Sequence, residues 1–289
     1  MNERLKWNWN GKSIDLGFEM RGEGSRLVLL LPALSSISTR AEMRPLAERL
    51  SADFKTLAVD WPGFGDSQKS AVAWQPDAYR AFIEFLLREF PNPFATVAAG
   101  HGAGYLIGHA AQRPGSAGRL CLIAPTWRGP LPTMMGRRHH AFRMIARLVD
   151  APLLGAALYR LNVNRPVIRM MGRGHVYSDC NWLEGGRLAA KLKVTNARGA
   201  RHASFRFVAG ELDPMQTRDE FLQVARRISD PTLVVYGADS PCRSKAEMQE
   251  FAALPGIASQ ELAQGKLAVH EEFPNKVANV IRNFLQEQA

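Results

Sequence analysis

Cysteine is scarce in this chain of 289 residues, which contains Cys121, Cys180 and Cys242. The number is odd and the spacings are not those of metal-ligating cysteines, so we expect neither a disulfide framework nor a zinc site. Few cysteines are typical of proteins from reducing compartments. No other motif indicates a metal or an organic cofactor, and we expect none.

The chain also lacks a long hydrophobic run. Its longest, Leu27 to Leu34, contains Pro32 and is much shorter than the roughly 20 residues that span a membrane. The segment from Met1 to Gly11 has no apolar stretch like that of a signal peptide. We therefore expect a cytoplasmic protein, which its basic residues could bring to the surface of a membrane.

Acidic residues are fewer than basic ones, 27 Asp and Glu against 37 Lys and Arg, which gives a net charge of +10. The excess is local. Residues 128–204 carry fourteen Lys and Arg and three acidic residues, a net charge of +11, while the rest of the chain carries −1. A basic excess of this size indicates an anionic partner. The hydrophobic content of 46% is that of a globular protein and excludes a disordered or collagen-like chain.

Apolar residues alternate between strand and helix spacing over most of the chain, which predicts a mostly parallel sheet covered by helices on both faces. The predicted strands are 5–9, 14–20, 27–31, 56–60, 94–99, 120–124 and 232–236, with a possible short one at 205–208. The predicted helices are 40–50, 76–90, 104–112, 218–228, 245–253 and 274–287. Between 126 and 204, helical patterns occur without strands. We therefore expect an α/β fold in three parts: a core over 1–125, a basic helical cap over 126–204, and the rest of the core over 205–289.

Two turns that follow predicted strands carry recognisable motifs. Residues 60–67 read D-W-P-G-F-G-D-S, and residues 100–104 read G-H-G-A-G and lead into a helix. These segments resemble the D-x-P-G-x-G-x-S and G-H-S-x-G motifs of the α/β-hydrolase family, in which the second turn holds the catalytic nucleophile. The resemblance covers nearly the whole chain. It implies the α/β-hydrolase fold, with a mostly parallel central sheet, helices on both faces and a helical cap insertion.

The same resemblance indicates a degenerate catalytic triad, as in a pseudoenzyme. Gly102 stands at the nucleophile position and has no side chain with which to attack a substrate. Ser240 stands at the position of the acid, with Asp239 one residue earlier. Leu267 stands at the position of the base, with His270 three residues later.

Backbone donors of an oxyanion hole do not depend on side chains and are expected to persist. The resemblance assigns them to Ala33 or Leu34 and to Ala103, and it places His101 under the turn, beside the ligand-binding position. Asp213 is either an alternative acid or the start of the helix before Arg218.

Two classes of function follow from these residues. The first is a ligand-binding or scaffold protein, with a small apolar or anionic ligand in the cleft, or an anionic membrane surface or acidic protein at the cap. Nucleic acid is not favoured, because few aromatic residues accompany the basic ones. The second is an active hydrolase or lyase in which His270 acts as general base beside the backbone oxyanion hole, on a small ester or carbonyl substrate. An ordinary esterase with a different alignment of its triad is a further alternative.

Overall fold

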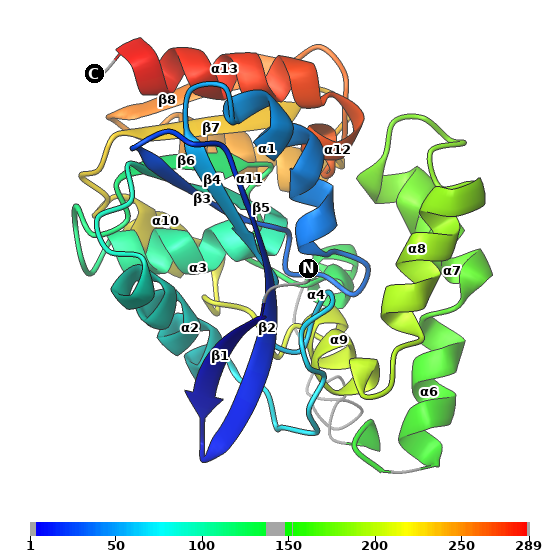
Figure 1. Ribbon diagram of the computed structural model, residues 1–289. Helices are drawn as coiled ribbons and strands as arrows, with labels where there is room; N and C mark the ends of the chain where they lie inside the picture. Colours follow the sequence, from blue (N-terminus) through cyan, green and yellow to red (C-terminus); the bar gives the residue numbers. More distant parts are fainter. Residues whose placement is uncertain (1–3, 137–147, 152, 288–289) are drawn as a thin grey trace.

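A computed structural model describes residues 4–136, 148–151 and 153–287 (Figure 1). Its centre is an eight-stranded sheet in the order β1-β2-β4-β3-β5-β6-β7-β8. β2 pairs antiparallel with β1 and β4, and all other neighbours are parallel. The strands are β1 (Arg4–Trp9), β2 (Lys12–Arg21), β3 (Leu27–Leu31), β4 (Lys55–Val59), β5 (Ala95–Ala99), β6 (Arg119–Ile123), β7 (Thr232–Gly237) and β8 (Ile257–Leu262).

Helices cover both faces of this sheet, as the alternating pattern predicts (Figure 1). Strand side chains point alternately to the two faces. On β3, Leu29 and Leu31 therefore join one buried cluster while Val28 and Leu30 join the other. One cluster is covered by α1 (Arg44–Leu50) and α13 (Pro274–Glu287). The other is covered by α2 (Pro76–Glu89), α3 (Gly100–Ala110), α10 (Arg218–Ala225) and α11 (Cys242–Ala252).

The described residues between 130 and 208 are mostly helical, and this segment, which we call the cap, stands beside the sheet domain, that is, beside the sheet and the helices that cover it (Figure 1). Its elements are α4 (Pro130–Met135), α6 (Leu154–Asn162), α7 (Arg165–Met171), the π-helical turn η2 (Gly172–Val176), α8 (Gly185–Thr195) and α9 (Ala200–Val208). The elements from α6 to α9 share a small apolar core that includes Tyr159, Ile168 and Phe205. Within residues 4–136, 148–151 and 153–287, no helix is long and apolar enough to cross a membrane.

Three local predictions differ from the structure. Residues 205–208 lie in α9, because Phe205 packs in the cap core while Phe207 packs in the sheet domain, so the alternating apolar residues contact two clusters. β8 was not expected, since it is an edge strand whose residues are mostly exposed. α3 begins at Gly100 rather than Gly104, directly after β5.

Candidate functional site

The turn between β5 and α3 is centred on Gly100, two residues earlier than the motif spacing suggests. Gly100 has a φ of +52°, in the left-handed region that favours glycine. A Cβ placed on Gly100 would lie 3.1 Å from the Cβ of Ala33. A side chain at this position would thus point at the loop after β3, as the nucleophile of an elbow points at the oxyanion loop.

Gly102 lies inside α3 and faces tightly packed atoms. A Cβ there would be 2.8 Å from Cζ2 of Trp61 and 3.0 Å from the carbonyl oxygen of Pro32. The Trp61 indole N–H donates to that same carbonyl over 2.7 Å. Gly102 therefore allows helix, indole and loop to approach closely, and no space remains for a side chain.

The loop after β3 is held on its other side by a buried carboxylate. The Ala33 N–H donates to Oε1 of Glu42 over 2.6 Å, and the Glu42 side chain is 2% exposed. Glu42 comes from the 3₁₀ turn η1 (Arg40–Met43). Ala33 is one of the two residues expected to supply an oxyanion donor, so this N–H is already paired with a negative group. Leu34, the other, is fully buried in the core.

His270 contacts the same carboxylate. Its Nε2 lies 3.4 Å from Oε1 of Glu42, which is long for a hydrogen bond, and the ring is 1% exposed. His270 sits on α12 (Val269–Glu272), which follows the loop after β8. Burial raises the pKa of Glu42, but His270, Lys191 and the Ala33 N–H outweigh burial and hold it below its ordinary value.

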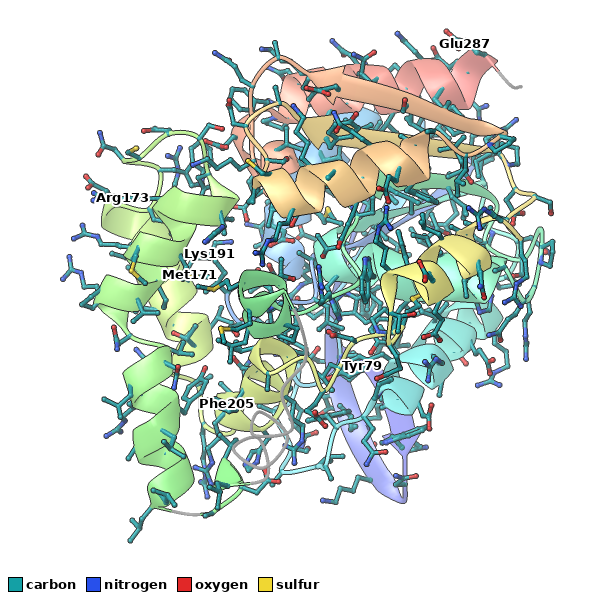
Figure 2. The ribbon with its side chains drawn as sticks, turned by 180° about the vertical axis from the view of Figure 1, so that it is seen from behind. Tyr79, Met171, Arg173, Lys191, Phe205 and Glu287 are labelled. Carbon is teal, nitrogen blue, oxygen red and sulfur yellow. The ribbon has the colours of Figure 1, made fainter. Side chains whose placement is uncertain are left out.

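Lys191 extends this cluster into the cap. Its Nζ, on α8, lies 2.6 Å from Oε1 of Glu271 and 3.8 Å from Oε2 of Glu42. The Tyr177 hydroxyl donates to the other oxygen of Glu271 over 3.0 Å. Figure 2 shows Lys191 on the side of the cap that faces the sheet domain. Burial alone would lower the pKa of Lys191, but Glu271, Tyr177 and Glu42 raise it above its ordinary value, so the ammonium group is retained. Charge pairing therefore joins the cap to the sheet domain beside Ala33.

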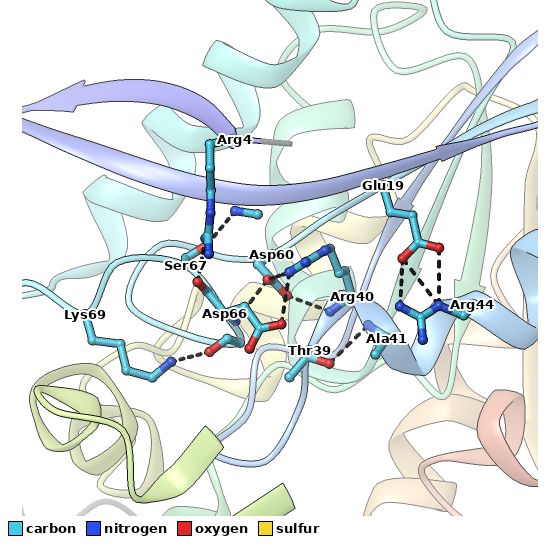
Figure 3. A network of polar contacts seen from close by, with 12 residues as sticks. Arg4, Glu19, Thr39, Arg40, Ala41, Arg44, Asp60, Asp66, Ser67 and Lys69 are labelled. Atoms are coloured by element: carbon cyan, nitrogen blue, oxygen red, sulfur yellow. Dashed lines mark hydrogen bonds and ion pairs between the residues drawn. The ribbon is translucent and has the colours of Figure 1, made fainter. Parts of the chain in front are cut away.

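A second buried ion pair fixes the loop after β4 (Figure 3). Asp60, fully buried, accepts hydrogen bonds from the Arg40 guanidinium and from the backbone N–H groups of Arg40 (2.6 Å) and Asp66 (3.0 Å). A Cβ on Gly65 or on Gly17 would collide with Asp60 or Arg40. The motif over 60–67 thus serves to position the loop, and its carboxylate is fully committed to Arg40 and the backbone.

His101 and Ala103 lie in the first turn of α3, whose N–H groups have no partner within the helix. The ring of His101 is buried; its Nε2 lies 2.8 Å from the carbonyl oxygen of Leu212 and 3.6 Å from Oδ1 of Asp213. Asp213 also accepts from the N–H of Gly129 over 2.7 Å. Asp213 does not begin a helix, since α10 starts at Arg218 with Thr217 as its cap. Asp213 instead contacts His101 and accepts the Gly129 N–H, next to the turn that precedes α3.

Within the described part of the chain, no hydrogen bond or ion pair joins His270 to Asp239 or Ser240, the residues expected as acid. Asp239 accepts from the Gly265 N–H (3.0 Å) and the Ser178 hydroxyl (3.1 Å), which ties two loops to the cap. The Ser240 hydroxyl is buried and has no hydrogen-bond partner among the described residues. The Leu267 N–H donates to the carbonyl oxygen of His175 over 3.4 Å, and Leu267 itself packs on the core.

Sequence reasoning selected His270 and Ala33 but missed Glu42, Lys191 and Glu271, which bring them together. Glu42 lies in a predicted helix and carries no motif, so only the fold shows that it is buried under the loop. Within the described ranges, no three His, Cys, Asp or Glu residues gather as metal ligands. A cavity of about 100 Å³ lies farther along α3, between α2 and α10; its lining includes Arg80, Tyr105 and His109, but not Gly100 or Glu42.

Comparison with known proteins agrees with this architecture. The model of the "Alpha/beta hydrolase family" matches residues 28–280. No curated protein sequence is significantly similar to the chain. A probable hydrolytic enzyme from Pseudomonas aeruginosa superimposes with a TM-score of 0.76 at 15% identity, covering 98% of this chain and 93% of that one. The epoxide hydrolase CorEH gives a TM-score of 0.74 at 16% identity over 100% of both chains. An enol-lactonase from Burkholderia xenovorans gives 0.70 at 16% identity, over 98% of this chain and 100% of that one. With the family model matching most of its length, and the sheet order and turn that the fold requires, the chain belongs to the α/β hydrolase family.

Proposed function

We propose that this chain is a ligand-binding or partner-binding member of its family that does not carry out Ser-His-Asp hydrolysis. One observation carries the proposal: the carboxylate of Glu42 accepts the N–H of Ala33 and contacts His270. A donor that should stabilise an oxyanion is thus paired with a resident anion, which would repel the negative charge of a tetrahedral intermediate.

The position of the nucleophile supports the same proposal. Gly100 has the left-handed backbone of the elbow and directs its missing side chain toward Ala33. In this register Ala98 and Gly102 are the small residues on either side, and the N–H of His101 takes the place of the second oxyanion donor. Gly100, like Gly102, offers no oxygen or sulfur for covalent catalysis.

The environment of the imidazole supports it as well. In a triad, a carboxylate after a strand orients the base while the base faces the nucleophile. Here Asp239 is engaged by Gly265 and Ser178, and His270 is buried against Glu42. The two groups able to move a proton therefore face each other.

The contact between Glu42 and His270 also favours a second candidate function, a hydrolase or lyase without a covalent intermediate. One member of the pair would accept a proton from water or from a carbon beside a carbonyl, and the other would stabilise the resulting charge. A small ester or carbonyl compound is the substrate class that suits the fold.

Two assays on the purified protein separate these functions. We expect no labelling of the wild type by a fluorophosphonate probe and no saturable hydrolysis of p-nitrophenyl acetate. The Gly100→Ser variant should also remain unlabelled by the probe, since the carboxylate of Glu42 still accepts the N–H of Ala33. Labelling of the wild type would contradict the proposal.

The second candidate function is tested with p-nitrophenyl acetate and enzyme that has not been treated with the probe. Turnover that His270→Gln and Glu42→Gln each abolish, and that His175→Gln retains, would establish acid–base catalysis. His175 is the matched control because it belongs to η2 of the cap, and its backbone carbonyl, which the substitution retains, accepts the hydrogen bond from the Leu267 N–H. Thermal unfolding of each variant shows whether the protein remains folded.

A further inference from the structure

Large apolar side chains that are exposed to solvent are concentrated in the cap. Among the described residues, Met20 is the one such side chain of the sheet domain, at 39% exposure. The others all fall between residues 134 and 170: Met134, Met135, Leu148, Leu153, Leu154, Leu161 and Met170. Single exposed apolar residues are ordinary, but their concentration in one segment indicates an interaction surface.

Helix α6 has two apolar faces. Gly155 and Tyr159 are buried toward the rest of the cap. Leu154, Leu158 and Leu161 follow one another at helical spacing on a different face, where Leu154 is 52% and Leu161 71% exposed. Leu153, just before the helix, is 87% exposed. The first face builds the cap core, and the second contacts no other part of the described chain closely enough to be buried.

Arginines accompany this exposed face. Arg160 flanks Leu161 on α6, Arg165 begins α7, and both are exposed without an acidic partner among the described residues. Met170 is 62% exposed on the same helix. Arg173, in the following turn, points outward from the cap (Figure 2). Long basic side chains beside apolar ones can bury their stems while the charged ends contact anions.

We propose that this cap face, formed by Leu153, Leu154, Leu161, Met170, Arg160 and Arg165, docks on an anionic membrane surface. The apolar side chains would enter the boundary between headgroups and acyl chains, and the guanidinium groups would contact lipid phosphates and carboxylates. α6 and α7 lie at the outer edge of the cap, away from the sheet, so a flat surface can reach them (Figure 1). This inference does not depend on the chemistry at Gly100.

Charge decides against a second copy of the chain as the occupant. A two-fold interface places the same patch of each copy against itself, which would bring Arg160 and Arg165 of both copies together without acidic partners. A membrane rich in anionic lipids supplies the opposite charge over a wide, flat area. The leucines also suit a deformable lipid surface, since Leu153 is 87% and Leu161 71% exposed.

Cosedimentation with vesicles tests the proposal. We expect binding to phosphatidylcholine vesicles that contain about one third phosphatidylserine, and loss of binding near 1 M salt, where charges about 3 Å apart or more are screened. Arg160→Glu with Arg165→Glu should weaken binding about tenfold or more, since each basic residue near an anionic surface contributes severalfold. Leu153→Ser with Leu161→Ser should weaken it by a similar factor, because apolar insertion is lost.

Matched controls use exposed residues of the sheet domain. Arg226→Glu with Arg227→Glu makes the same change in net charge, and Met20→Ser removes an exposed apolar side chain; both should bind like the wild type. Equal weakening by the cap and control charge variants would overturn the proposal, as would absence of binding at low salt. Self-association in sedimentation velocity that the cap variants abolish, without vesicle binding, would assign the face to a second copy instead.

Discussion

A buried ion pair of the sheet domain and an exposed ion pair of the cap show how differently the same residue types can be used. In the sheet domain, glycines stand where a Cβ would collide, as at Gly17, Gly65 and Gly102, and the Arg40–Asp60 pair is buried. In the cap, a Cβ on Gly155 or Gly172 would collide as well, while Gly174 and Gly186 have no atom within 4 Å of an added Cβ. The Arg169–Glu184 pair there is 3.8 Å long, with both side chains more than one third exposed. Close packing therefore restricts glycines in both regions, and the two ion pairs differ in burial: Arg40–Asp60 is enclosed, whereas Arg169–Glu184 remains accessible to solvent.

At the boundary between the two regions, basic residues of the segment 128–204 are buried against acidic residues of the sheet domain. Lys191 of the cap is largely buried between Glu42 and Glu271 of the sheet domain, and Arg128 of the same basic segment is largely buried against Glu247 of α11. Arg160 on α6 and Arg165 on α7 are exposed and have no acidic partner among the described residues. The net charge of the segment thus divides into cations that pair with the sheet domain, such as Lys191 and Arg128, and cations that face solvent.

The largest difference between the regions should be seen in their ion pairs. Asp60→Ala leaves the buried Arg40 guanidinium with only the half-exposed carboxylate of Asp66, 3.3 Å away, and we expect the free energy of unfolding to fall by about 3–5 kcal/mol. Glu184→Ala removes the exposed partner of Arg169 and should lower it by no more than about 1 kcal/mol. Urea denaturation of both variants measures the contrast. Equal losses would show that burial does not distinguish the two regions.

The attachment of the cap should depend on pH through Glu42. Because the folded-state pKa of Glu42 lies below its ordinary value, its ionised form stabilises the fold above the unfolded pKa of about 4.3. That contribution is lost as the pH falls through the lower folded-state pKa. At pH 7, Glu42→Gln should reduce the free energy of unfolding by about 1.5–3 kcal/mol, the range for hydrogen bonds to charged groups.

The difference between wild type and Glu42→Gln should therefore shrink as the pH is lowered from 7 toward 3. Urea denaturation at each pH gives the difference. Glu261→Gln is the control: this carboxylate pairs with Lys245 at the surface, so its loss should change stability far less. A pH-independent difference for Glu42→Gln would indicate that shape, and not charge, is what matters at this position.

Much of the fold follows from local patterns that are visible in the sequence. Continuous apolar strands alternating with amphipathic helices are sufficient for the sheet and its two covering layers, since both faces must be buried. The edge strand β8 could not be predicted in this way, because its exposed residues show no apolar pattern. α9 was misread in part because its aromatic residues contact the cap and the sheet domain at once.

The candidate site was less predictable, for two physical reasons. Glycine or alanine occurs at every second position from Ala98 to Gly104, so the small-x-x-x-small pattern fits both Gly100 and Gly102. Only the backbone shows which residue is left-handed. Moreover, Glu42 and Glu271 are far apart in sequence and belong to ordinary helical patterns; the fold alone brings them to Lys191.

The smallest predicted changes in stability concern two adjacent glycines at the start of α8, where substitution by alanine should have opposite effects. Gly186 has open space and an ordinary φ, so Gly186→Ala should stabilise the helix by about 0.4–1 kcal/mol, because alanine restricts the unfolded chain. Gly185 has equal space but a φ of +52°, and Gly185→Ala should destabilise it by about 1–2 kcal/mol. Hydrogen exchange of the α8 amides measures both. If both substitutions slowed exchange, the backbone at Gly185 would be able to relax to a negative φ. The conformation at the start of this cap helix would then be less restricted than that of the glycine turns in the sheet domain.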